Sequence, residues 1–283
     1  MAARTSPTQR QRRLGAEVRK MRTSAGLSAG SAASLLGVDR GKISNIESGA
    51  RAISPERLRV LARACACTDA SLVDALVDMA QPTTRGWWEQ YREALPSKLG
   101  DIAELEFHAV RMRAAYSMHV PGLLQTPDHA LALFRVVIPA LSERDIALRL
   151  AHRLERQATL NGPSATPYTG IIHEAALRMQ FGGASVARAQ LLHLIDKSEQ
   201  PNVRLLVIPF EAGAIPGAGQ TVLYAEGPVP GLDTVQIDNS HGPDFLHSDS
   251  QLAKYRAHLD WMENVALQPE RARDFIRAIA RQL

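Results

Sequence analysis

Residues 27–51, LSAGSAASLLGVDRGKISNIESGAR, predict two short helices joined by a tight turn. Ser28 is a suitable N-cap for the first helix, and Gly37 is placed to end it. Asp39 is predicted to cap the second helix, whose two isoleucines recur at a spacing that turns them inward. Gly49 then ends the second helix. This stretch therefore predicts a helix, a turn and a second helix that leaves one face free.

The flanking sequence predicts three more helices. Apolar residues recur at helical spacing over residues 12–25, and Gly26 stops that pattern. Ser54, Pro55 and Glu56 open a further helix with a cap, a first-turn proline and a first-turn acid. Asp69 is placed to cap the last one. Five short helices within residues 1–80 predict a compact all-α domain.

The charge of the chain is unevenly distributed. Residues 1–68 hold 13 Lys and Arg against 4 Asp and Glu, whereas residues 69–283 hold 20 against 25. The basic N-terminal part indicates a polyanionic partner, and the acidic remainder indicates a role other than binding that polyanion. Double-stranded DNA is the polyanion that a helix-turn-helix would bind, because the major groove admits one α-helix.

The second helix of the pair opens with side chains suited to base edges. Arg40, Gly41 and Lys42 form its first turn, and Asn45 lies on a similar face one turn later. Arginine can grip guanine through O6 and N7, and asparagine can grip adenine through N6 and N7. On these residues alone, an ordinary basic surface helix of a small bundle remains an open alternative.

The quoted stretch resembles the helix-turn-helix of the Cro/repressor (XRE) family. The residues that match its pattern are Leu27, Ser28, Gly37, Val38, Ile43, Ser44, Ile46, Glu47 and Gly49. The resemblance implies that bases are read from Arg40, Gly41 and Asn45, with Ser44 close by, and that Lys42 and Arg51 lie nearer phosphates. Ala29 and Gly30 depart from the family, which usually has a polar residue there. Because Gly41 has no side chain, selectivity should depend mainly on Arg40 and Asn45.

The resemblance also implies a structural ion pair. Glu47 corresponds to the acid that pairs with an arginine late in the first helix, here Arg22, and we expect this pair to be partly buried. A loose surface contact is the alternative. The basic stretch RQRR at residues 10–13 is interpreted either as an arm that contacts DNA or as a solvated tail.

Residues 81–86, QPTTRG, are predicted to link this domain to a second one at residues 87–283. The second domain mixes helical and strand patterns, so the fold class is mainly α with an α+β C-terminal domain of helices around a small sheet. Helices are expected over 86–95, 101–114, 127–138, 142–160, 184–200, 249–266 and 269–281. Strands are expected over 115–120, 168–174, 202–210, 221–227 and 233–238.

No catalytic, cofactor or metal motif is found in the sequence. None of the nine histidines forms an i, i+4 pair, and His241 and His247 fall in a stretch, 241–247, that is interpreted as a loop. Cys65 and Cys67 are interpreted as free thiols, consistent with a reducing cytoplasm. No apolar run reaches the roughly 18 residues of a membrane span, and the N-terminus has no secretory signal. We therefore expect a cytoplasmic, nucleoid-associated protein that is not an enzyme and does not bind a membrane.

The second domain resembles the C-terminal domain of actinobacterial WhiJ-like regulators. The resemblance is carried by GWWEQY (86–91), RLERQATL (153–160) and PNVRLLVIPFEAGAIPGAGQ (201–220). It implies a regulatory domain whose relatives are associated with a small acidic partner protein, some in pairs similar to toxin–antitoxin modules.

The sequence thus favours a dimeric DNA-binding transcriptional regulator, expected to be a repressor, controlled through its C-terminal domain by a small-molecule effector or a small partner protein. The alternative is an antitoxin-like protein that binds a small acidic partner and autoregulates its operon. Weakly indicated ligand or partner contacts are Trp87, Trp88, Tyr91, Gln125 and Phe210. Packing of the tryptophans in the domain's own core remains open.

Overall fold

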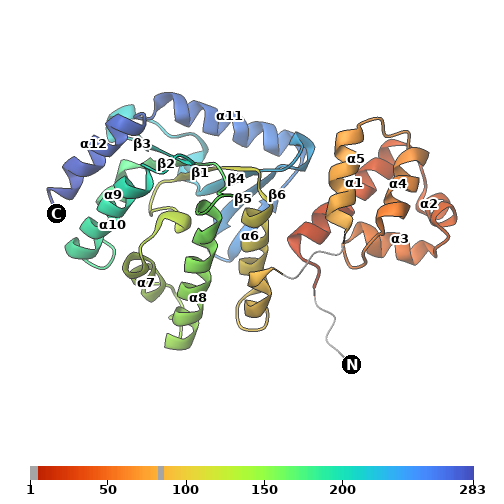
Figure 1. Ribbon diagram of the computed structural model, residues 1–283, viewed down its shortest axis with the longest axis horizontal. Coiled ribbons are helices and arrows are strands. Elements are labelled where there is room, and N and C mark those ends of the chain that lie inside the picture. Colours follow the sequence, from red (N-terminus) through yellow and green to blue (C-terminus); the bar gives the residue numbers. More distant parts are fainter. Residues whose placement is uncertain (1–5, 82–85) are drawn as a thin grey trace.

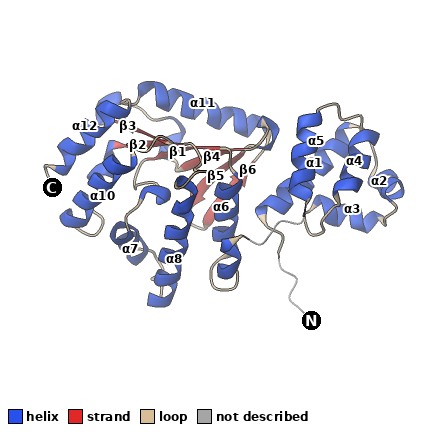
Figure 2. Ribbon diagram, viewed as in Figure 1, coloured by secondary structure: helices blue, strands red, loops and turns tan. Residues whose placement is uncertain are grey.

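The computed structural model describes residues 6–81 and 86–283, which form a small helical domain beside a larger domain built on one mixed sheet (Figures 1 and 2). We call residues 6–81 the head and residues 86–283 the body. Residues 82–85 of the predicted linker lie outside the described residues. The head helices are α1 Gln9–Ser24, α2 Ala29–Leu36, α3 Arg40–Glu47, α4 Pro55–Ala64 and α5 Ala70–Ala80.

Local signals set the helix ends in the head. The hydroxyls of Ser28 and Ser54 and the carboxylate of Asp69 each accept a hydrogen bond from a backbone N–H in the first turn of their helix. Gly37 has a left-handed φ of 61°, and its N–H returns to the last turn of α2. The helix predicted over 12–25 begins earlier, because Thr8 forms a capping box with Gln11.

The head packs around its own core, which also takes in Leu232 and the partly buried Val229 of the body. Leu58, Leu61 and Leu76 are almost fully buried at its centre, with Val18 from α1 beside them. Leu232, from the loop between two strands of the body, completes this core and is only 6% exposed. The head is therefore seated on the body through an apolar contact.

The body contains a six-stranded sheet in the order β3-β2-β1-β4-β5-β6. Strands β1, β2 and β3 pair in parallel, and β4, β5 and β6 continue the sheet in antiparallel pairing. The strands are β1 Arg111–Tyr116, β2 Tyr168–His173, β3 Val203–Ile208, β4 Val222–Glu226, β5 Thr234–Asn239 and β6 Gly242–Leu246. This arrangement gives the expected α+β body.

Helices cover both faces of the sheet. The body helices are α6 Ser97–His108, α7 Pro127–Arg135, α8 Glu143–Arg156, α9 Glu174–Arg178, α10 Ala184–Lys197, α11 Asp249–Val265 and α12 Pro269–Ala280. Along β3, Val203, Leu205 and Val207 face α10 and α12, whereas Leu206 and Ile208 face α11. The period of two along this strand buries both of its faces.

Several body elements differ from the sequence prediction. The first strand is 111–116 rather than 115–120, so the C-terminal part of the helix predicted over 101–114 is strand. The stretch 241–247, interpreted as a loop, contains β6. Residues 86–95 form only a short 3-10 turn, Trp87–Tyr91, instead of a helix. The backbone of β1 pairs with β2 and β4, which are distant in sequence, and that of β6 pairs with β5, and local patterns do not show these pairings.

Polar contacts also hold the head against the body. The backbone N–H of Gln9 donates to Asp101 at 2.8 Å, and the Arg12 guanidinium pairs with the same carboxylate at 2.9 Å. Lys20 pairs with Asp249 at 3.0 Å. We call this contact between α1 and the body, at α6 and the β4–β5 loop, the seam. It fixes α1 and leaves α2 and α3 on the side of the head away from the body (Figure 1).

Candidate DNA-binding surface

The two helices of the predicted motif are held at a fixed angle by packing against α1. Gly49, just after α3, has φ +78°, and a Cβ built there would lie 2.7 Å from the backbone carbon of Gln11. Gly15 on α1 approaches α3 as closely, because its Cβ would lie 2.5 Å from the carbonyl oxygen of Ile46. Only glycine fits at these two contacts, so α3 lies directly against α1.

α3 has one buried and one exposed face. Ile43 and Ile46 are 3% and 4% exposed and pack into the head core. The opposite face consists of exposed residues, namely Arg40, Gly41, Ser44 and Asn45. Within the described residues, no hydrogen bond or ion pair engages the side chains of Arg40, Ser44 or Asn45. These groups are available to a ligand that approaches α3.

Lys42 lies on the same helix but already has a partner. Its ammonium pairs with Asp39 at 2.8 Å, and this contact lowers the pKa of the Asp39 carboxyl. Asp39 does occupy the N-cap position, but its side chain makes no capping hydrogen bond, contrary to the expected role. The first-turn N–H groups of α3 are therefore not covered by this carboxylate and remain able to bind an anion.

Arg51 is exposed in the loop after α3. Its backbone N–H donates to the carbonyl of Asn45 at 3.0 Å, so the loop folds back on the last turn of the helix. The residues predicted to contact bases and those predicted to contact phosphates thus belong to one continuous, solvent-accessible segment.

Arg22 and Glu47 form a two-armed ion pair beneath this segment. Nε of Arg22 donates to Oε1 of Glu47 at 2.5 Å, and a terminal nitrogen donates to Oε2 at 3.1 Å. The side chains are 11% and 10% exposed, and Arg22 also donates to the carbonyl of Leu27. Hydrogen bonding to Glu47 raises the pKa of Arg22. The pair connects the end of α1, the start of α2 and the end of α3.

The basic stretch 10–13 is not an extended arm. All four residues belong to α1, and two of its arginines are committed to the protein itself. Arg13 is buried, pairs with Glu17 and donates to the carbonyl of Gly231 at 2.5 Å, while Arg12 pairs with Asp101. The solvated-tail interpretation is wrong, because these residues belong to α1 and Arg13 is buried.

The residues weakly predicted for ligand or partner contact do not form one site. Trp88 and Tyr91 are buried, and the Tyr91 hydroxyl donates to Glu155 at 2.6 Å. Trp87 packs edge-on against Trp88, and its ring is tilted by 50° against that of His152. Gln125 is 1% exposed, and its amide holds the 120–126 turn through the carbonyl of Val120.

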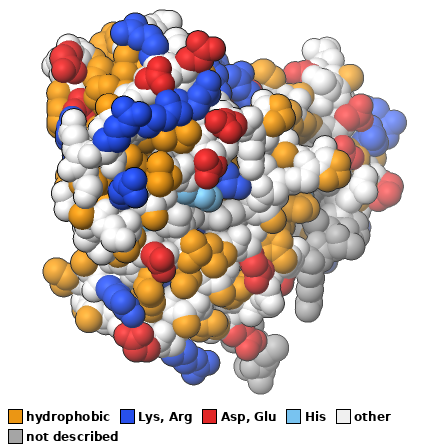
Figure 3. Space-filling model, turned by 60° about the vertical axis from the view of Figure 1, so that its left-hand side comes forward, with side chains coloured by type: hydrophobic (Ala, Val, Ile, Leu, Met, Phe, Trp, Pro, Cys, Tyr) orange, Lys and Arg blue, Asp and Glu red, His pale blue; other side chains and the backbone are white. Residues whose placement is uncertain are grey.

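Phe210 lies apart from this group. It is 54% exposed, follows the end of β3 and contacts the ring of His173, the last residue of β2. On the face of the body in Figure 3, basic side chains lie among acidic and hydrophobic ones. This face therefore does not offer the uninterrupted basic surface that a DNA backbone would require.

Two family comparisons match this chain. Residues 13–76 match a helix-turn-helix domain, and residues 99–278 match the family described as "Domain of unknown function (DUF5753)". The chain belongs to the DUF5753 family. No curated protein and no solved structure matches the chain.

The helix-turn-helix match covers α2, α3 and the core that supports them, which assigns DNA binding to the head of this DUF5753 protein. The DUF5753 match covers the sheet and most body helices. None of the helices in the described part of the chain is long and apolar enough to span a bilayer. Over the same residues, no group of three or more His, Cys, Asp or Glu is placed to hold a metal.

Proposed function

We propose that this protein is a sequence-specific, DNA-binding transcriptional regulator that inserts α3 into the major groove. The observation that carries this proposal is the exposed face of α3, opposite two buried isoleucines. There the side chains of Arg40, Ser44 and Asn45 have no hydrogen-bond or ion-pair partner among residues 6–81 and 86–283. Unpartnered side chains at the start of a surface helix are what base-edge recognition requires. Lys42 and Arg51 would contact phosphates on either side.

We further propose a homodimer that acts as a repressor in the cytoplasm, associated with the nucleoid. One recognition helix contacts few base pairs, so selectivity favours two heads on half-sites about 34–36 Å apart. The body would supply the dimer contacts and a regulatory rather than a catalytic role. It would respond to a small effector or partner protein by changing how the two heads are held.

Replacing Arg40 by alanine should weaken binding to the preferred site by about 1–3 kcal/mol and relax selectivity at one base pair. The reason is the loss of a side chain that can bind a guanine edge through two hydrogen bonds. The preferred site would be selected from randomised duplexes with the full-length protein, and affinities measured by fluorescence anisotropy. Arg63→Ala, an exposed arginine on α4, removes the same charge from the head without touching α3.

The matched comparison on the same helix is Lys42→Ala. Loss of a phosphate contact should weaken binding to preferred and random duplexes alike and reduce the slope of log affinity against log salt by about one. Without Lys42, the unpaired carboxylate of Asp39 would also repel the DNA phosphates. Equal losses for Arg40→Ala and Lys42→Ala on both kinds of duplex would show that the base and phosphate contacts are wrongly assigned.

A second candidate function is an antitoxin-like protein that binds a small acidic partner protein. It is favoured by the corner after α7, where Val136 and Ile138 are 62% and 93% exposed. Exposed apolar side chains of this kind mark protein contacts. Co-expression with each small acidic protein that proves to be encoded beside the gene should give, for one of them, a complex that Ile138→Asp disrupts. A complex that survives Ile138→Asp, or none with the unaltered chain, would argue against this function.

A further inference from the structure

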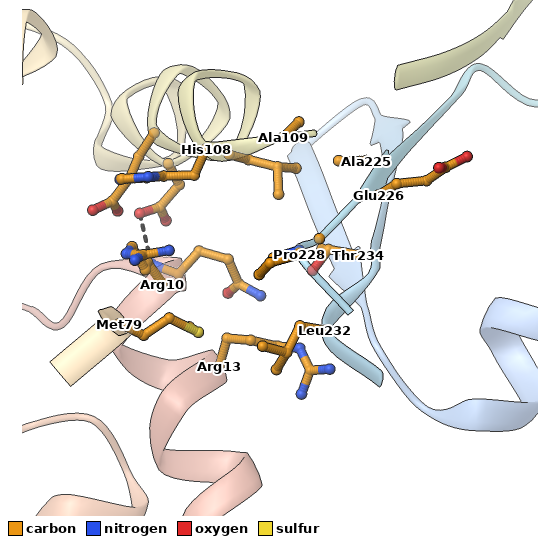
Figure 4. Close-up of a pocket in the computed structure, with 15 residues that line it drawn as sticks. Arg10, Arg13, Met79, His108, Ala109, Ala225, Glu226, Pro228, Leu232 and Thr234 are labelled. Atoms are coloured by element: carbon orange, nitrogen blue, oxygen red, sulfur yellow. Dashed lines mark hydrogen bonds between the residues drawn. The ribbon is translucent and has the colours of Figure 1, made fainter. Parts of the chain in front are cut away.

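A cavity of about 60 Å³ lies in the seam between head and body. Arg10 and Arg13 of α1 and Met79 of α5 line it from the head, and His108 of α6 and Pro228 line it from the body (Figure 4). Its volume corresponds to about four to six water-sized groups, since one water needs roughly 10–15 Å³. Part of its wall is apolar and part is charged.

Three atoms of the charged wall lack hydrogen-bond partners, although the Glu104 side chain also bonds to Thr8. Nε of Arg10, Oε2 of Glu104 and Nε2 of His108 are all buried and have no hydrogen-bond partner within the described residues. Burial raises the pKa of Glu104 and lowers that of His108 to about 4, so the imidazole is neutral near pH 7. Buried polar groups without partners are costly. Three such atoms around one cavity form a wall that a small polar molecule could satisfy.

The arrangement of these groups restricts the chemistry of that molecule. Arg10 and Glu104 carry opposite charges, face a common cavity and feel each other's field, yet they form no ion pair within 4.0 Å. A molecule with a carboxylate for Arg10 and an ammonium for Glu104 would satisfy both. The cavity volume limits it to about the size of glycine or alanine. Ordered water could fill the same space without bridging two charges.

We propose that the seam cavity is the effector site and that it binds a small zwitterion of α-amino acid type. This deepens the proposed function, on which it rests, by placing the regulatory ligand between the DNA-binding head and the body. Arg10 belongs to α1, and Glu104 belongs to α6. A ligand held by both stabilises the seated position of the head and thereby alters how α3 is presented.

The test titrates the full-length protein calorimetrically with glycine and L-alanine. Acetate, which has only the carboxylate, and methylammonium, which has only the ammonium, are titrated as the two halves of the amino acid. Glycine or alanine should bind and raise the melting temperature, and each half should bind about tenfold or more weakly. Glu104→Gln and Arg10→Gln, one on each side of the seam, should each weaken amino-acid binding about tenfold or more. Glu93→Gln, at an exposed position on the body, should leave it unchanged.

A second measurement concerns regulation. Saturating glycine or alanine should change the affinity of the unaltered protein for its selected duplex and leave that of Glu104→Gln unchanged. The inference is overturned if neither amino acid binds, which would leave water in the cavity, or if both charge variants bind as tightly as the unaltered chain. Binding without an effect on DNA affinity would overturn the effector role.

The inference and the function that it deepens can fail separately. A protein that binds no duplex at all, but still binds glycine through Arg10 and Glu104, would contradict the proposed function and leave the ligand site standing. A protein that selects a duplex but ignores both amino acids would contradict the ligand site alone.

Discussion

Replacing Glu106 by alanine should lower the free energy of unfolding by about 3–5 kcal/mol, the cost of leaving one member of a buried ion pair without its partner. Glu106 on α6 is 1% exposed and Arg156 at the end of α8 is 8% exposed. Two hydrogen bonds join them, at 2.7 Å from Nε and 2.5 Å from a terminal nitrogen. Without Glu106 the guanidinium would remain buried and unpaired.

Chemical denaturation of the full-length protein would measure this loss. Asp274→Ala is the control, because Asp274 pairs with Arg277 on the surface of α12 and is 78% exposed. Such surface pairs contribute about 0–1 kcal/mol. A Glu106→Ala protein no less stable than the Asp274→Ala protein would show that Arg156 finds another partner or water.

Replacing Glu47 by alanine should destabilise the head by about 3 kcal/mol, the lower end of the range for buried pairs, because Arg22 keeps slight solvent contact. For a domain of 60–100 residues each kcal/mol corresponds to roughly 4–8 °C in melting temperature. DNA affinity should fall as well, since Glu47 anchors the last turn of α3. Thermal unfolding and duplex binding measure the two effects.

Two further variants separate the causes of that loss. Asp74→Ala breaks the exposed Arg59–Asp74 pair in the same head and should cost under about 1 kcal/mol. The double variant Arg22→Leu/Glu47→Leu removes both charges and should recover part of the stability, because no unpaired ion remains. If the double variant is less stable than Glu47→Ala alone, packing rather than charge dominates this contact.

Local signals in the sequence were sufficient for most helix ends of the head, although Asp39 makes no capping hydrogen bond and α1 begins earlier than predicted. Ser28, Gly37, Ser54 and Asp69 act within one or two turns of their own positions, so caps and stops could be predicted without knowing the fold. The exposed face of α3 followed from the spacing of the two isoleucines. The Arg22–Glu47 pair came from family resemblance, because no local rule pairs residues 25 apart.

Predictions failed where partners outside a stretch determine its burial or its secondary structure. The charge run at 10–13 has the composition of a solvated arm, yet Arg13 is buried because the carbonyl of Gly231, 218 positions away, accepts its hydrogen bond. Residues 242–246 contain a glycine and a proline, yet they form β6 because β5 offers a free edge. Neither partner could be read from the stretch concerned.

The sequence by itself determined the helices of the head, the inward and outward faces of α3, and the concentration of positive charge at one end of the chain. These depend on neighbours within a few residues or on simple composition. Only the tertiary structure decided that the head is seated on the body through Leu232, that Glu106 is paired with Arg156, and that Arg10 faces Glu104 across a cavity. Such contacts join residues far apart in the chain, and burial makes them strong only once the whole fold has excluded water.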